Sequence, residues 1–299
     1  AMSNQLSPAT NLPYRIAQIC RVWGVARSTF YKHFSRLKAV AEPGRRRGPL
    51  GPCSDDDLVQ RIREVLCASP FHGEGYRKVW ARLRHQGLRT SQARVRRLMR
   101  QHELAAPYHP KRRHGSKAHD GRITTDRPDE MWGTDATSVL TGEGTATIFL
   151  AVDHCTAECI GIHAARRGTR FEALEPIRQG IRKHWGGYEA DIAHGLALRH
   201  DHGSQFMSHH FQDELKFLGV RSTPAFVGEP ECNGVAERFI RTLKEQLLWL
   251  TPFDTVEHLR RELLAFKQRY NANWLVQKHN HRTPDQVREN FPSRTAQAA

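Results

Sequence analysis

Three acidic residues lie within or at the ends of apolar segments, where a carboxylate without a specific function is not expected. Asp135 lies in the largely apolar stretch MWGTDATSVL, Asp201 ends LALRHD, and Glu237 follows NGVA at the start of an amphipathic segment. A carboxylate in a buried strand is costly unless it is paired or bound to a metal ion. Carboxylates from separate elements are hard oxygen ligands of the kind that Mg2+ prefers, and a pair of ions can clamp both oxygens of a phosphodiester displacement. We therefore predict that these three residues are catalytic and bind divalent metal together.

Two cations follow the last of these carboxylates at helical spacing. Arg241 and Lys244 stand four and seven residues after Glu237, so all three side chains share one face of a helix. We predict that Arg241 and Lys244 contact DNA phosphates beside the metal site.

The elements around these residues predict an α/β domain. Three apolar segments separated by short turns indicate antiparallel strands, and helices and strands alternate after them. This order favours a mixed five-stranded sheet flanked by helices. The expected strands are 131–140, 146–154, 158–165, 196–201 and 219–224, and the expected helices are 169–185, 208–218, 234–249 and 255–271.

The charge of the chain indicates a polyanionic partner. The 299 residues contain 46 Lys and Arg against 31 Asp and Glu, a formal net charge of +15. Of these, 25 basic and 9 acidic residues lie in 1–126, so the rest of the chain is nearly neutral. A basic half beside a neutral half predicts that the first binds nucleic acid and the second performs another task.

The first basic segment has the spacing of a helix-turn-helix. Apolar residues at Ile16, Ile19, Trp23, Val25 and Phe30 are expected to be buried around a turn at Gly24, where glycine permits a positive φ. An ordinary helical hairpin with a solvated basic face is the alternative. The predicted DNA contacts of the second helix are Arg27, Ser28, Thr29 and Lys32.

A second helical unit is predicted over residues 55–106. Its last helix buries Val95 and Leu98 and presents several arginines, of which Arg94, Arg97 and Arg100 are predicted to contact DNA. A solvated helix face is the alternative, but no acidic residue stands at i−4 or i+4 to compensate these charges.

Pro, Gly and basic residues mark two linkers, over 41–54 and 107–126. Both could follow a phosphate backbone. Their predicted DNA contacts are Arg45, Arg46, Arg47, Lys111, Arg112 and Arg113.

Nothing in the sequence indicates a membrane or secreted protein. No apolar run reaches the roughly 20 residues that cross a bilayer, and the N-terminal residues lack the apolar stretch of a signal peptide. Six scattered Cys fit a reducing compartment better than a disulfide framework. We expect a cytoplasmic, nucleoid-associated bacterial protein.

Taken with their contexts, these residues resemble one family. Asp135 in WGTDAT, Asp201 in HDHGSQF and Glu237 in NGVAERFIRTLK, with 35 residues between the last two, are similar to the acidic triad of bacterial DDE transposases of the insertion sequence 3 family. The segments GYRKVWARLRHQGLRTSQARVRRLM and YNANWLVQKHNHRTPDQV resemble its second helix-turn-helix and its C-terminal signature. The chain resembles the product of the downstream reading frame of such an element.

The resemblance implies a fold and a reaction. It implies a ribonuclease H-like core shared with retroviral integrases, which uses two Mg2+ or Mn2+ ions per site. It also implies that water cuts at the element's end and that the freed 3′ hydroxyl attacks another phosphodiester, with a joined or circular intermediate.

The expected organisation combines DNA readers with a catalytic core. It runs as a helix-turn-helix domain at 1–40, a linker at 41–54, a second such domain at 55–106, a linker at 107–126, a catalytic core at 127–250 and a C-terminal helical region at 251–299. The expected partners are double-stranded DNA at element ends and targets, further copies of the chain in at least a dimer, and an upstream-frame protein. An integrase-core nuclease, or a DNA-binding regulator without strand transfer, is the alternative function.

Overall fold

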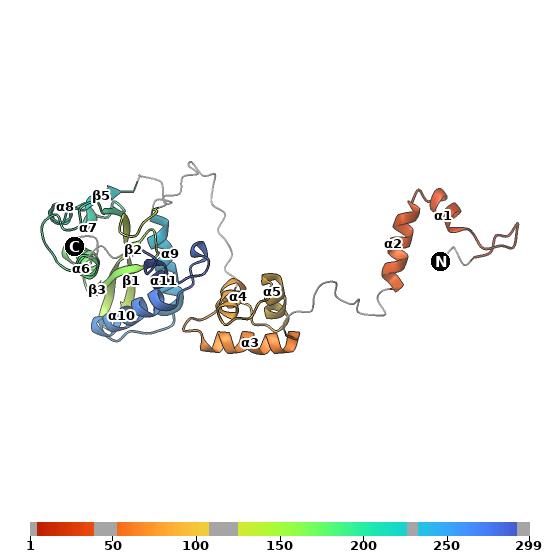
Figure 1. Ribbon diagram of the computed structural model, residues 1–299, viewed down its shortest axis with the longest axis horizontal. Helices are drawn as coiled ribbons and strands as arrows, with labels where there is room; N and C mark the ends of the chain where they lie inside the picture. The colour runs from red at the N-terminus through yellow and green to blue at the C-terminus, as the bar shows by residue number, and fades with distance from the viewer. Residues whose placement is uncertain (1–4, 39–52, 108–124, 226–232, 292–299) are drawn as a thin grey trace. The chain divides into compact units, whose positions relative to one another are not determined.

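The computed structural model describes residues 5–38, 53–107, 125–225 and 233–291 (Figure 1). The chain divides into two compact units, residues 1–51 and 52–299. Each unit is described by itself.

The first unit holds two helices joined by a tight turn. Helix α1 (Ile16–Val22) and helix α2 (Arg27–Lys38) meet at Gly24, whose φ is +63°. The predicted pair of helices and its glycine turn are therefore confirmed.

The predicted core of this first unit was wrong. Cys20 is the one buried side chain among its described residues, whereas Trp23 is 65% exposed and Val25 is 42% exposed. Two helices of 7 and 12 residues touch along a single line and have too little surface to enclose a core.

The second unit begins with a three-helix domain that buries its own core. Its helices are α3 (Asp55–Ala68), α4 (Tyr76–His85) and α5 (Gln92–Gln101). Ser54 closes a capping box with Asp57 at the start of α3, and the Ser91 side chain accepts from Arg94 N at the start of α5. The core residues are Leu58, Val59, Ile62, Val65, Val79, Leu83, Val95, Leu98 and Met99.

A mixed five-stranded sheet follows, as the sequence predicted. Strands β1 (Met131–Thr141), β2 (Gly144–Asp153) and β3 (Cys159–Ala165) pair antiparallel, while β4 (Ala197–His200) and β5 (Arg221–Pro224) add in parallel. The strand order is β3-β2-β1-β4-β5. Strand β1 therefore lies at the centre, where the sheet changes from antiparallel to parallel pairing.

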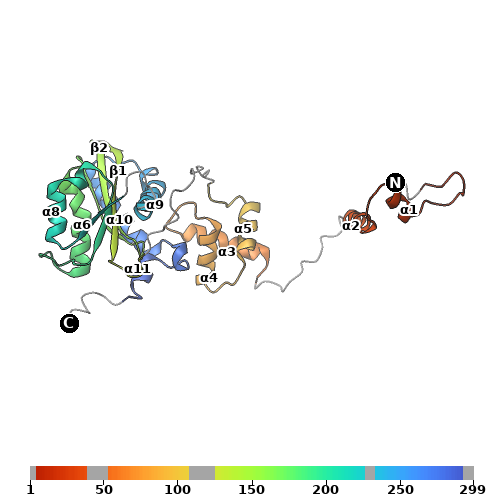
Figure 2. The same ribbon diagram turned by 90° about the horizontal axis from the view of Figure 1, so that it is seen from above.

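Helices cover both faces of the sheet (Figure 2). Helices α6 (Arg170–Trp185), α7 (Ser204–Met207) and α8 (His209–Phe217) bury one face together with Trp132 and Phe149. Helices α9 (Gly234–Leu243) and α10 (Val256–Asn273) bury the other face over Ile148, Leu150 and Val152. Since side chains alternate along a strand, Trp132 faces α6, and Gly133 and Asp135 face α9.

The helix that carries Glu237 departs from the predicted 234–249 span. The α-helical part of α9 ends at Leu243, and a π-helix, η4, continues over Lys244–Leu248. The chain then ends its described part with η5 (Gln277–His279) and α11 (Pro284–Arg288).

The three-helix domain contacts the region after the sheet directly. His72 N donates to Gln246 Oε1 at 2.8 Å, and Gln246 Nε2 donates to His72 O at 3.0 Å. The rings of Phe71 and Trp274 meet edge-on with centroids 4.9 Å apart, and Arg82 donates to Asn273 O at 3.2 Å. The segment between α3 and α4 is thus tied to η4 through His72, and Phe71 of the same segment and Arg82 of α4 contact the end of α10.

Within the described ranges, no helix combines the length and the apolar character that a membrane span requires.

Candidate active site and nucleic-acid interface

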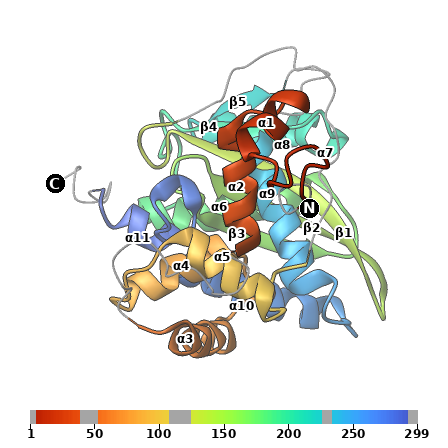
Figure 3. The ribbon, with the colours of Figure 1, turned by 90° about the vertical axis from the view of Figure 1, so that its right-hand side faces the viewer.

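The three predicted carboxylates come from three elements that meet on one face of the sheet. Asp135 lies within β1, Asp201 directly follows β4, and Glu237 lies in the first turn of α9. Because β1 and β4 pair in parallel with Gly133 opposite Arg199, the residues two further on, Asp135 and Asp201, point to the same side. Helix α9 lies against β1 and β2 on that side (Figure 3).

Asp201 and Glu237 are close enough to Asp135 to affect its ionisation. The pKa of Asp135 is raised to about 6, chiefly by burial and also by the negative charges of Asp201 and Glu237, while the Ala136 N–H and Lys244 act to lower it. Burial also raises the pKa of Glu237. The structure therefore brings the predicted triad together in one electrostatic environment, with Lys244 beside it.

Local hydrogen bonds orient two of the carboxylates. Ala136 N donates to Asp135 Oδ1 at 2.8 Å, and Gly203 N donates to Asp201 Oδ1 at 2.9 Å. Each aspartate keeps a second oxygen for another ligand.

Three carboxylates are a donor set that suits Mg2+ or Mn2+. In the part of the chain that the structure describes, however, no three His, Cys, Asp or Glu side chains form a group that could hold a metal ion as they stand. Like charges repel, so these side chains would have to draw closer around a cation.

The two cations predicted beside Glu237 differ in availability. Arg241 Nε donates to Glu245 Oε1 at 2.8 Å and forms an ion pair there, although its side chain is 63% exposed. Lys244 is half-buried and begins the π-helix η4. A π-turn within a helix is frequent at functional sites, and here it begins at Lys244, whose charge lowers the pKa of Asp135.

Two predicted DNA contacts on α5 are paired with an acidic residue of the same chain. Arg94 donates from Nε to Asp55 Oδ1 at 2.9 Å and from Nη2 to Cys53 O at 2.8 Å, and Arg97 donates to Asp55 Oδ2 at 2.8 Å. The sequence shows no acidic residue four positions before or after these arginines in α5. Their negative partner is instead Asp55, in α3. Arg94 and Arg97 hold α5 against the start of that helix.

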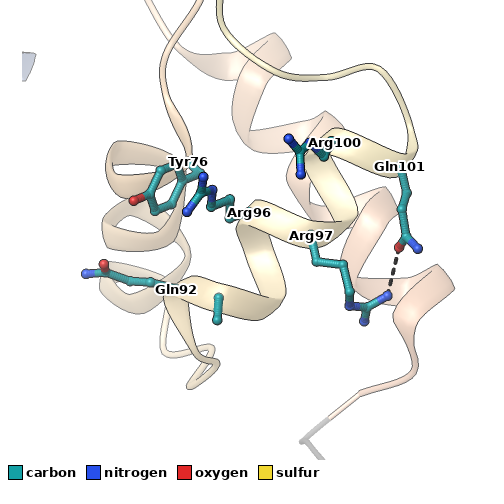
Figure 4. Close-up of a pocket in the computed structure, with 7 residues that line it drawn as sticks. Tyr76, Gln92, Arg96, Arg97, Arg100 and Gln101 are labelled. Carbon is teal, nitrogen blue, oxygen red and sulfur yellow. Dashed lines mark hydrogen bonds between the residues drawn. The ribbon is translucent and has the colours of Figure 1, made fainter.

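The exposed face of α5 instead lines a shallow hollow of about 660 Å³ (Figure 4). Arg96 and Arg100 are exposed there, and the Arg96 guanidinium lies 5.6 Å from the centre of the Tyr76 ring. Neither arginine hydrogen-bonds to another described residue, so both are available to an anion. The hollow is lined by Tyr76, Gln92, Ala93, Arg96, Arg97, Arg100 and Gln101.

The remaining predicted contacts fall in two groups. Arg27, Ser28, Thr29 and Lys32 are exposed on α2. The linker residues Arg45, Arg46, Arg47, Lys111, Arg112 and Arg113 lie outside the described residues.

Comparison with known proteins matches two parts of the chain to protein families. Residues 54–112 match an HTH-like domain, and residues 218–284, which include Glu237, match an integrase core domain. Over 204 residues the chain is 28% identical to the transposase InsD of insertion element IS2A/D/F/H/I/K from Escherichia coli, covering 66% of this chain and 67% of that protein.

Two solved structures are also similar. The BIV integrase catalytic core is 21% identical, with a TM-score of 0.42, over 54% of this chain and 95% of that one. The HTLV-2 integrase catalytic core in complex with magnesium is 16% identical, with a TM-score of 0.41, over 54% of this chain and 97% of that one.

A helix-turn-helix reader followed by a ribonuclease H-like integrase core defines a polynucleotidyl transferase that acts on DNA. Over about two thirds of its length the chain is also similar to a transposase of a bacterial insertion element.

Proposed function

We propose that the chain binds the ends of an insertion sequence, cuts a strand there and joins the freed 3′ hydroxyl to a second DNA site. The observation that carries this proposal is the electrostatic coupling of Asp135 with Asp201 and Glu237 across β1, β4 and α9. A carboxylate whose pKa is raised by two neighbouring carboxylates costs stability at neutral pH, so the arrangement around Asp135 favours a site built for a cation.

In this proposal Asp135, Asp201 and Glu237 hold two Mg2+ or Mn2+ ions. Bound divalent cations supply Lewis acidity and neutralise the charge that develops on the phosphodiester oxygens. The carboxylates position the cleaved strand through these contacts. Lys244, beside the triad, binds a nearby phosphate and holds the backbone in place.

DNA recognition in this proposal lies on exposed faces of α2 and α5. Arg96 and Arg100 bind phosphates above the Tyr76 hollow, while Arg27, Ser28, Thr29 and Lys32 contact DNA from α2. We also propose that the DNA-binding domains, linkers, catalytic core and C-terminal region meet at residues 40, 54, 106, 126 and 250. At least two copies assemble on paired ends, since one triad per chain must serve two ends.

Isosteric substitution tests the triad. We expect Asp135→Asn and Asp201→Asn each to lower strand transfer from a pre-cut, labelled element end by about 100-fold or more with Mg2+, since a charged ligand is lost while volume is kept. Products are mapped on a denaturing gel. Asp213→Asn, on the exposed side of α8, is the matched control and should transfer at the wild-type rate. Near wild-type transfer by both triad variants would refute the assignment, and cutting without joining would favour a nuclease.

A further inference from the structure

Three buried polar side chains converge beneath the first turn of α9. His154 follows β2, Arg199 lies in β4 and Asn233 is the N-cap of α9, and their exposures are only 4%, 8% and 6%. They meet at Gly133 of β1, which pairs with Arg199. A Cβ at Gly133 would lie 2.6 Å from Asn233 Oδ1 and 2.9 Å from His154 Nε2.

These side chains carry polar atoms with no hydrogen-bond partner among the described residues. The atoms are both ring nitrogens of His154, Nε and Nη1 of Arg199, and Oδ1 of Asn233. The Asn233 amide cannot be reversed, because its Nδ2 donates to Thr134 O at 2.9 Å. Each buried polar group left unpaired costs about 1–3 kcal/mol, so three at one place indicate a shared ligand.

The donor and acceptor inventory identifies the chemistry of that ligand. Arg199 only donates, Asn233 Oδ1 only accepts, and a neutral imidazole does one of each. His154 is neutral at pH 7, because burial and then the charges of Lys278 and Arg199 lower its pKa to about 4. Arg199 disfavours a cation, and the Asn233 oxygen disfavours an anion. A water molecule both donates and accepts, and it needs two to four partners when buried.

We propose that Arg199, His154 and Asn233 bind one buried water molecule beneath α9 and act through it as positioning residues for the acidic triad. The site joins the three elements of the triad. Asn233 bonds to Thr134, next to Asp135, and stands one turn before Glu237, while Arg199 lies two residues before Asp201. The water-linked cluster thereby fixes the height of α9 above β1 and β4. This role rests on the proposed metal-dependent function.

A matched pair of asparagine variants of the full chain tests the role. Asn271 is equally buried at 4% exposure, but its amide bonds on both sides to Cys159, at 2.9 Å and 3.0 Å, in β3, which carries no member of the triad. Both Asn233→Ala and Asn271→Ala remove a buried amide. Binding of Mn2+ is measured from the electron paramagnetic resonance signal of the unbound ion, and thermal unfolding is measured in parallel.

We expect Asn233→Ala to raise the Mn2+ concentration at half-saturation by about 10-fold or more, the size of effect that outer-shell partners of metal ligands have. For Asn271→Ala the Mn2+ concentration at half-saturation should stay within about twofold of the wild-type value, even if its Tm falls as much as that of Asn233→Ala. Equal half-saturation in the two variants would overturn the positioning role. A separate result would refute the proposed metal site, namely that Asp135→Asn binds Mn2+ as tightly as wild type does.

A crystal structure of the wild-type chain gives a second test that needs no variant. We expect electron density for one water within hydrogen-bond distance of Asn233 Oδ1, His154 Nε2 and the Arg199 guanidinium. Direct bonds among the three side chains, with no water between them, would overturn the proposal.

Discussion

At the scale of single residues, a cluster of buried carboxylates surrounds Arg288. Its guanidinium donates to Asp129 at 2.8 Å and 3.0 Å and to Glu158, and it lies 3.9 Å from Asp153. Although burial alone would raise them, Arg288 helps to hold the pKa values of Asp129 and Glu158 below their usual range. The cation from α11 therefore compensates Asp129 and shares the compensation of Glu158 with Lys183, which lies 2.7 Å from Glu158.

Removing that cation should strongly destabilise the core. We expect Arg288→Leu to lower the free energy of unfolding by about 3–5 kcal/mol, because it leaves buried carboxylates uncompensated. Urea denaturation at pH 7 measures this change. Arg61→Leu is the control, since Arg61 pairs with Glu64 at 3.9 Å on the surface and should contribute about 1 kcal/mol or less. A loss at Arg288 as small as that at Arg61 would contradict the account.

The same cluster predicts a pH dependence with a definite sign. Carboxylates with lowered pKa values stabilise the fold above their unfolded pKa of about 4, and this contribution is lost as the pH falls through their folded values. Asp153 works in the opposite direction, because burial raises its pKa. We therefore expect the difference in Tm between wild type and Arg288→Leu to shrink as the pH falls from about 5 to below about 4, towards the lowered folded pKa values of Asp129 and Glu158. A difference that grows over this range would reverse the assignment of charges.

At the scale of elements, α5 has two faces with separate tasks. Arg94 bonds to Asp55 and Cys53 O, whereas Arg96 and Arg100 face the hollow beside Tyr76. We expect Arg96→Gln and Arg100→Gln each to reduce the slope of log affinity against log salt by about 0.9, because one phosphate contact is lost. Fluorescence anisotropy with end DNA at several salt concentrations measures the slope.

The inward face of α5 supplies the control for that prediction. Arg94→Gln should lower the Tm and leave the slope near its wild-type value, because its partner is a carboxylate of the same chain. A slope that changes equally in all three variants would show that Arg94 leaves Asp55 to bind DNA.

Sequence patterns predicted what depends on local spacing and missed what depends on distant pairing. The strands around Asp135 and the glycine turn at Gly24 follow from periodicity and backbone freedom, both of which are local. The partner of Arg94 lies 39 residues away on another helix, and no helix-spacing rule reveals it. The meeting of His154, Arg199 and Asn233 depends likewise on the register of β1 with β4.

The exposed apolar side chains of the first unit are a failure of another kind. Apolar spacing at Trp23 and Val25 marks a helix face that could be buried, but burial also requires a surface opposite that face. Two helices alone do not provide one.

At the scale of the whole molecule, the proposed function requires that the triad of each chain serve one of two paired DNA ends. We expect catalysis in trans, in which the readers of one copy hold the end that another copy cuts. A chain carrying Glu237→Gln is mixed with a chain lacking residues 1–51, the first compact unit. Strand transfer should return in the mixture when neither parent alone is active. If no mixing ratio restores transfer, or if light scattering finds one chain on each paired-end complex, this arrangement is excluded.

The contact between α4 and the end of the catalytic region limits how such enzymes can exchange parts during evolution. Reciprocal bonds join His72 to Gln246, and Phe71 and Arg82 contact Trp274 and Asn273. A three-helix domain taken from a relative that recognises another end sequence would supply only one side of these contacts. Recombination between related chains should therefore succeed when residues 71–82 stay with the chain whose catalytic region they contact, whereas the outer face of α5, which makes none of these contacts, can change independently.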